Sequence, residues 1–428
     1  MLSRMEHDSI GALNVPEEAY YGVQSMRAAT NFQITHRPLH PVLIDSIVMV
    51  KKAAAITNEK SGKLDQQIAQ AIIQACDEIL NGNLRDQFIV DAIQGGAGTS
   101  ANMNANEVIA NRAIEILGGT KGDYSIVHPN DHVNMSQSTN DVIPTAGKIT
   151  VLKLLPQTIK ELEKLEKAME EKEAEFDDIL KMGRTQLQDA VPMRLGQSFG
   201  AFAHVLKRDI KRLKNVMDEM KVLNIGATAI GTAINVDPYY LANISYELSK
   251  VAGISLKQAD DLIDATQNLD GFVSVSGVLK TCAVDISKIS NDLRLMSSGP
   301  RTGLSEINLP ARQNGSSIMP GKINPVIPEV VSQVAYLIIG HDYTITMAAE
   351  AGQCEEYIEK SVGISTALCP YIGYAKSAEI AKKSLKTGIS VKELVLEEGL
   401  LKEEELKEIL KPEKMTQPMR EKVMKAVS

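Results

Sequence analysis

The chain has 428 residues, of which 44% are hydrophobic, 23% are charged and only 4% are aromatic, with 17 Met and no Trp. This composition is ordinary for a soluble globular protein of two or three domains, with a core of mainly aliphatic side chains. The formal net charge of −8 and the lack of a basic run argue against a nucleic-acid-binding surface.

Residues 1–137 are expected to form a first domain, with helices over 44–58, 66–80 and 103–117. A glycine-rich turn, residues 94–100, precedes the third of these helices. Such a turn can bind phosphate, but this one lacks the P-loop lysine and follows no convincing strand. A carboxylate contact through Thr99 is therefore a better prediction than nucleotide binding.

Residues 138–353 are expected to form a central domain of long amphipathic helices. The clearest apolar stripe runs from Phe272 to Met296 with spacings that alternate between three and four, the heptad pattern of near-parallel packed helices. Another helix should begin at Pro325. Its stripe, like the others, is expected to serve the core or a contact between subunits, and it comprises Val330, Val334, Leu337 and Ile338.

Residues 354–428 are expected to form a small C-terminal helical domain. Ser390 and Glu393 match a capping box that opens a helix running to Leu396. Gly399 then ends this helix before a charged helix over residues 403–410, whose charges are most simply a solvated face.

The cysteine and histidine patterns bear on the cellular compartment of the protein and on its cofactors. None of the four cysteines has metal-ligand spacing or a close partner: Cys76, Cys282, Cys354 and Cys369. Buried, reduced thiols are therefore expected, which predicts a cytoplasmic protein. The first 21 residues lack the apolar core of a signal peptide, and no apolar run approaches a membrane span. With neither His-x-x-x-His nor Cys-x-x-Cys, we expect no metal site and no cofactor.

Residues 315–325, GSSIMPGKINP, combine two serines, two glycines and two prolines with Lys322 and Asn324. Glycine lets backbone amides converge on an anion, and proline limits flexibility. Pro325 suits the first position of a helix, so Lys322 and Asn324 precede a helix N-terminus, where a carboxylate is favoured. The alternative is an ordinary loop, which explains Gly and Pro but not Ser-Ser with Lys-x-Asn.

This loop resembles the signature loop of the fumarase/aspartase superfamily, whose members eliminate a group from a succinyl-type skeleton to release fumarate. Residues 136–141, SQSTND, and 183–190, GRTQLQDA, resemble two further motifs of that family, in the same order. The resemblance covers essentially the whole chain apart from a gap after Gln353. It implies an all-α fold of three domains around a long central helical bundle, and a homotetramer whose sites combine residues of different subunits.

Elimination of ammonia from a 2-amino dicarboxylate requires a base for an unactivated C–H proton and preorganised donors for the doubly charged aci-carboxylate that forms. Even a million-fold acceleration requires about 8 kcal/mol, more than one side chain normally supplies. By the resemblance, Ser316 is the general base, held as an oxyanion by loop amides and nearby positive charge. The residues alone do not rank Ser316 above Ser317.

The resemblance implies roles for the other candidate residues. The β-carboxylate is expected to lie among the hydroxyls of Thr99, Ser138, Thr139 and Ser317. The α-carboxylate is expected at Lys322 and Asn324, with Thr185 beside them, and the departing amino group at Asn140 and Gln186. Glu329 lies two helical turns after Lys322 and is expected to orient it, unless it is simply solvated.

Position 186 discriminates within the family. Fumarases usually have His where this chain has Gln186, and Gln cannot exchange a proton near neutral pH. Together with residues 191–193 and 304–307, this favours reversible deamination of L-aspartate to fumarate. The alternatives are a fumarate hydratase and a non-catalytic relative. Residues 128–131 resemble the family's secondary anion site, although a surface turn explains them equally well.

The resemblance breaks after Gln353. In the family, the matching residues lead into the last long bundle helix, whereas here Cys354 follows at once. Roughly 30–40 residues are missing, enough for one helix of about 45–60 Å, whether they are deleted from the protein or absent only from the printed sequence. Because bundle helices run antiparallel, a direct bond would leave the C-terminal domain at the wrong end of the bundle. We therefore predict a spatial break between Gln353 and Cys354, so that these two residues are not adjacent in space.

Overall fold

A computed structural model describes residues 2–351, 362–387, 389–411 and 415 of the chain. The chain divides into two compact units, and each is described here by itself. The first unit comprises residues 1–150, 221–268 and 353–428, and the second comprises 151–220 and 269–352. The three-domain division stays a prediction.

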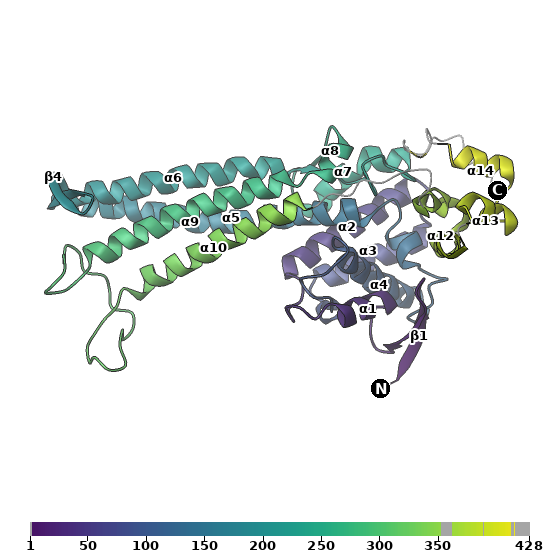
Figure 1. Ribbon diagram of the computed structural model, residues 1–428, viewed down its shortest axis with the longest axis horizontal. Coiled ribbons are helices and arrows are strands. Elements are labelled where there is room, and N and C mark those ends of the chain that lie inside the picture. The colour runs from purple at the N-terminus through teal and green to yellow at the C-terminus, as the bar shows by residue number, and fades with distance from the viewer. Residues whose placement is uncertain (1, 352–361, 388, 412–414, 416–428) are drawn as a thin grey trace. The chain divides into compact units, whose positions relative to one another are not determined.

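The first unit contains a group of helices (Figure 1). These helices are α1 (Val23–Asn31), α2 (Pro41–Lys60), α3 (Gln66–Leu80), α4 (Thr99–Ile116), α7 (Pro238–Ala252) and α8 (Leu262–Gln267), together with the start of α5 (Thr139–Glu175). Helix α2 packs against α3, α4 and α7, and Ile47, Ile72 and Ile109 are fully buried. The helices predicted over 44–58, 66–80 and 103–117 are confirmed.

The C-terminal part of the first unit is a group of short helices. They are η3 (Val362–Leu368), α11 (Cys369–Ile372), α12 (Tyr374–Thr387), α13 (Val391–Glu397) and α14 (Glu403–Ile409). Leu368, Ile380 and Leu394 are fully buried and form the centre of their core. The capping box is confirmed, because Ser390 Oγ accepts a hydrogen bond from the Glu393 amide at 3.2 Å.

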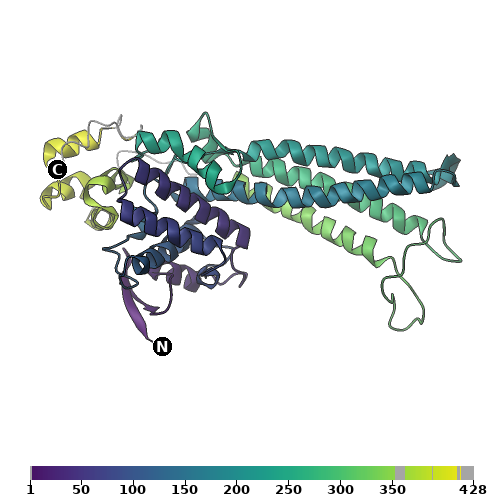
Figure 2. The same ribbon diagram turned by 180° about the vertical axis from the view of Figure 1, so that it is seen from behind.

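The second unit contains a bundle built from the rest of α5, α6 (Leu195–Met220), α9 (Asp270–Met296) and α10 (Val326–Glu350), seen from both sides in Figures 1 and 2. The start of α6 lies close to α5, since a Cβ on Gly196 would lie 2.4 Å from the Glu173 carbonyl oxygen. Helix α9 contacts both α6 and α10, as its heptad pattern predicts.

The apolar stripe predicted on α10, for the core or for a subunit contact, is largely exposed in this chain. Val330, Val334 and Leu337 are 47%, 51% and 59% exposed. The buried residues of α10 are small or polar instead, and they include Ser332 and Asp342. Asp342 accepts hydrogen bonds from Ser276 and Lys280 of α9. Helix α10 therefore approaches α9 through this polar face, which leaves the apolar stripe open; its proposed role in subunit contact is untested.

The described residues also form three two-stranded sheets. Strands β1 (Ser3–His7) and β2 (Ala12–Pro16) are antiparallel, as are β3 (Leu180–Thr185) and β4 (Gln188–Arg194). Strands β5 (Val222–Leu223) and β6 (Lys257–Gln258) are parallel. No helix in the described part of the chain has the length and apolar character needed to span a membrane.

The cysteines that the structure describes are free. Cys76 and Cys282 are buried as expected, whereas Cys369 is only half-buried. Cys354, and with it the predicted break after Gln353, lies outside the described residues.

A buried carboxylate holds the N-terminal segment in place. Glu107 on α4 accepts hydrogen bonds from the backbone amides of Gly22, Gln24 and Ser25 at 2.8, 2.9 and 3.0 Å. Burial raises the pKa of Glu107 to about 7, and the nearby Glu6 carboxylate acts in the same direction. A Cβ on Gly22 would lie 2.6 Å from Glu6 Oε2, so the segment fits only with glycine there.

This raised pKa predicts a pH-dependent stability. Between the ordinary value of 4.5 and about 7, the folded state keeps a proton that the unfolded state has released. Wild type should therefore lose stability as pH rises through that window, by up to about 1.4 kcal/mol per pH unit. Glu107→Gln carries no such proton, so its stability relative to wild type should improve from pH 5 to pH 7. Urea denaturation at both pH values tests this, with exposed Glu17→Gln as control; an unchanged difference would refute it.

Candidate active site

Two helix N-termini meet in the first unit at residues that are predicted to bind the β-carboxylate. Thr99 is the first residue of α4 and Thr139 the first of α5. Asn102 Nδ2 donates to Thr139 Oγ1 at 3.3 Å, which joins the first turns of the two helices. A Cβ on Gly98, whose φ is +89°, would lie 3.0 Å from Ile143 of α5. The dipoles of the two helices favour an anion at such a place.

Ser138 and Asn140 are fixed by neighbouring backbone. The Ser138 amide donates to Asp141 Oδ1 at 2.8 Å, and Ser138 Oγ accepts from the Asn140 amide at 3.3 Å. Asn140 Nδ2 donates to the Ala229 carbonyl oxygen at 2.8 Å. This bond orients the amide and leaves Asn140 Oδ1 to accept a hydrogen bond from a cationic group.

Sequence reasoning missed a buried lysine behind this segment. Lys51 on α2 is fully buried, and its Nζ donates to Asn134 Oδ1 at 2.8 Å and Gln137 Oε1 at 2.9 Å. Burial lowers the pKa of Lys51 to about 7 and raises that of Asp141 to about 6, while each charge partly offsets the other's shift. Buried ionisable groups with displaced pKa values are typical of functional sites.

In the second unit, Thr185 and Gln186 lie at the tip of the β3–β4 hairpin, where both are exposed. Thr185 pairs with Gln188, so Gln186 and Leu187 are the two turn residues, with φ of +52° and +62°. Two-residue hairpins prefer this left-handed geometry, usually with Gly or Asn.

The 315–325 loop closes on itself. The Gly315 amide donates to the Lys322 carbonyl oxygen at 2.8 Å, and Asn324 Nδ2 donates to the Gly315 carbonyl oxygen at 3.0 Å. A Cβ on Gly315 would lie 2.5 Å from Asn324 Cγ, so only glycine fits. Helix α10 then begins at Val326, with Pro325 as its N-cap rather than its first residue.

The two loop serines differ in their hydrogen bonding. Ser316 Oγ accepts from the backbone amides of Ile318 at 3.3 Å and Met319 at 3.0 Å. Ser317 is exposed and makes no hydrogen bond among the described residues. Amide donors stabilise negative charge on an oxygen, so the loop distinguishes Ser316 where the residue types did not.

Lys322 and Asn324 line an open cavity of about 710 Å³ at the end of α9. Glu329 also lines it, and its carboxylate lies 3.7 Å from Arg294. Within the described residues, Lys322 is exposed and has no ion-pair partner. Arg294 is a second cation in the same cavity. Sequence reasoning did not single it out, because it lies between the apolar positions of the α9 stripe, where a charged residue is ordinary.

The predicted site residues therefore form two groups. Those in the first unit are Thr99, Ser138, Thr139 and Asn140. Those in the second unit are Thr185, Gln186, Ser316, Ser317, Lys322, Asn324 and Glu329.

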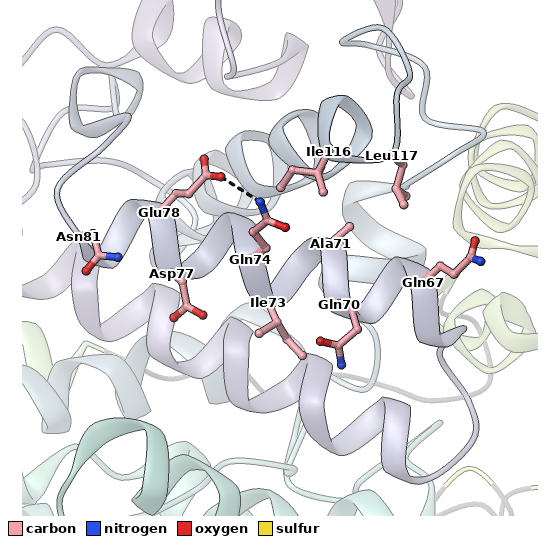
Figure 3. A pocket seen from close by; sticks show the side chains of 10 residues that line it. All are labelled: Gln67, Gln70, Ala71, Ile73, Gln74, Asp77, Glu78, Asn81, Ile116 and Leu117. Atoms are coloured by element: carbon pink, nitrogen blue, oxygen red, sulfur yellow. Dashed lines mark hydrogen bonds between the residues drawn. The ribbon is translucent and has the colours of Figure 1, made fainter.

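A second hollow, of about 500 Å³, lies along α3 in the first unit (Figure 3). Amide side chains such as Gln70 and Gln74 line it, and Gln74 donates to Glu78 at 3.4 Å. No motif residue lines this hollow. The described residues also contain no cluster of three or more His, Cys, Asp or Glu suited to a metal ion.

Two family profiles match the chain. The profile described as Lyase matches residues 11–340, and that described as Fumarase C C-terminus matches residues 364–417. The chain belongs to the fumarase/aspartase superfamily. The resemblance of residues 136–141, 183–190 and 315–325 to this family is thereby confirmed.

Members of the superfamily are similar over nearly the whole chain. An aspartate ammonia-lyase from Bacillus sp is 50% identical to this chain, and the alignment covers 97% of this chain and 98% of that protein. Another, from Escherichia coli K12, is 46% identical, with 97% of this chain and 96% of that protein covered.

Solved structures confirm the mostly helical fold. A fumarate lyase:delta crystallin from Brucella melitensis bound to cobalt has a TM-score of 0.81 at 47% identity, covering 97% of this chain and 100% of that chain. A class II fumarase from Schistosoma mansoni has a TM-score of 0.79 at 32% identity, covering 98% of this chain and 100% of that chain.

The relatives also contain residues that this chain lacks. Since 97% of 428 residues is about 415, about 40 of the 457 positions aligned with the Bacillus protein have no residue here. This number agrees with the loss of one long helix. Residues 341–363, between the two matched profiles, include Gln353, where the loss is predicted.

Proposed function

We propose that this chain catalyses the reversible deamination of L-aspartate to fumarate and ammonia. The observation that carries the proposal is its full-length similarity to proteins curated as aspartate ammonia-lyases, at 46–50% identity. Gln186 supports it further, because glutamine cannot serve as the proton carrier that hydration needs.

Ser316 is the proposed base. Its oxyanion, stabilised by the Ile318 and Met319 amides, takes the proton from the β-carbon. The electron pair moves into the β-carboxylate, which becomes an aci-carboxylate dianion. Collapse of this dianion forms the carbon–carbon double bond and expels the amino group on the opposite face, leaving fumarate.

The other residues stabilise the charges of these steps. The β-carboxylate is proposed to bind Thr99, Ser138, Thr139 and Ser317, where the paired N-termini of α4 and α5 favour anions. Lys322, with Asn324 and Thr185, is proposed to anchor the α-carboxylate, and Glu329 to support Lys322. Asn140 Oδ1 and Gln186 are proposed to accept hydrogen bonds from the departing ammonium group.

A homotetramer is the proposed assembly, with each site drawn from several subunits. The open stripe of Val330, Val334 and Leu337 on α10 supports this, because an apolar stripe of that length usually contacts another surface. A light-scattering mass of one chain in an active sample would refute it. A cytoplasmic location is proposed from the free cysteines of the described residues.

The decisive experiment follows fumarate by its ultraviolet absorbance, first with L-aspartate and then with L-malate. We expect fumarate from aspartate alone. Fumarate from malate alone would instead identify a fumarate hydratase. No fumarate from either, in a folded sample, would identify a non-catalytic relative.

A further inference from the structure

A strained loop adjoins Asn140 in the first unit. Residues 224–237 connect β5 to α7. Five of them have positive φ: Gly226, Thr228, Gly231, Ala233 and Asn235. Thr228, at φ +59°, is β-branched and only 5% exposed. This left-handed conformation costs a non-glycine residue about 1–2 kcal/mol, so surrounding contacts must maintain it.

Asp141 maintains this conformation. Its fully buried carboxylate accepts hydrogen bonds through Oδ2 from the amides of Gly226 and Thr228, both at 3.1 Å. Its Oδ1 accepts from the Ser138 amide at 2.8 Å. One carboxylate thus joins the loop to the segment that carries the candidate site residues.

The loop in turn holds Asn140 by both its side chain and its backbone. The carbonyl of Ala229, the residue after Thr228, accepts from Asn140 Nδ2 at 2.8 Å. Asn224 Nδ2 donates to the Asn140 carbonyl oxygen at 3.0 Å. The direction of the Ala229 carbonyl depends on the backbone at Thr228, so the left-handed turn decides where Asn140 Oδ1 points.

We propose that Thr228 is a positioning residue for the amino group: its left-handed backbone fixes the Ala229 carbonyl and thereby aims Asn140 Oδ1 at the leaving ammonium. The inference rests on the proposed function and extends it from Asn140 to a loop that does not touch substrate. It assigns the loop to ammonia recognition and not to the carboxylates.

The amination direction tests this, because there ammonia and fumarate bind as separate substrates. Thr228→Gly frees the backbone, so we expect the KM for ammonia to rise about tenfold, the effect of misdirecting one charged hydrogen bond. The KM for fumarate should stay within about twofold. Thr228→Asn, which tolerates the left-handed conformation, should keep an ammonia KM near that of wild type.

Ala233→Gly is the matched control, since Ala233 has φ +53° in the same loop and is buried, without a hydrogen bond to Asn140 or Asp141. It should change neither KM. Asn140→Ala is the reference and should raise the ammonia KM at least as much as Thr228→Gly. Circular dichroism and thermal midpoints check that all variants fold.

Three results would overturn the inference, each for a different reason. If Asn140→Ala raises the ammonia KM and Thr228→Gly does not, the loop does not position Asn140. If Thr228→Gly raises both KM values equally, its effect is general loosening. If Asn140→Ala leaves the ammonia KM unchanged, the proposed role of Asn140 fails. A separate result, a wild type unable to aminate fumarate, would refute the proposed function itself.

Discussion

Ser316→Ala is expected to lower kcat for aspartate by about a hundred- to ten-thousandfold, the range that a positioned base contributes. The KM should change little, because the hydroxyl acts mainly in the transition state. Steady-state kinetics of fumarate formation measure both. A variant that kept a large part of the wild-type kcat would show that Ser316 is not the base.

The hydrogen bonds of Ser316 call for a second variant. Alanine also removes the acceptor for the Ile318 and Met319 amides, so a loss of activity could come from a disordered loop. Ser316→Asn retains a side-chain oxygen that can accept from amides two and three residues on, but it has no hydroxyl. It should be as inactive as Ser316→Ala, whereas Ser317→Ala should keep more activity than either.

Lys322→Ala is expected to reduce kcat/KM by about 10- to 150-fold, which corresponds to about 1.5–3 kcal/mol for a hydrogen bond to a charged group. Both parameters should change, with KM raised and kcat lowered, because the α-carboxylate is anchored in the ground state and in the transition state. Initial rates over a range of aspartate concentrations separate the two effects.

Arg312→Ala provides the matched control, since Arg312 is an exposed cation just before the same loop. It should leave KM and kcat within about twofold, because the field of an exposed charge is screened by salt. If both variants raised KM equally, Lys322 would act through general electrostatic attraction and not as an anchor.

The helices could be predicted because their periodicity is a local property of the sequence. The stripe from Phe272 to Met296 predicted α9, which spans Asp270–Met296. The loop at 315–325 was also predictable, since its residue types limit the backbone directly. The exposure of Val330 and Leu337 was not predictable, because periodicity identifies an apolar face without identifying what covers it.

Other features depend on contacts between distant residues. Lys51 lies within an ordinary helical pattern, and its burial depends on Asn134 and Gln137, 83 and 86 residues away. The strands β3 and β4 are largely exposed and lack a clear alternation of apolar and polar residues. Nothing in a threonine side chain signals the left-handed backbone of Thr228, which Asp141 imposes from another segment.

The closed form of the 315–325 loop has a consequence for the entropy of ligand binding. Ordering one backbone residue costs about 1–2 kcal/mol of conformational entropy, and a flexible loop would lose this entropy each time a ligand binds. Here Gly315 is joined to Lys322 and Asn324 by hydrogen bonds within the loop, so most of this entropy is lost when the chain folds. When the loop moves toward a ligand, it should therefore rotate about its flanking residues as a rigid body, so that Ser316 and Lys322 move together.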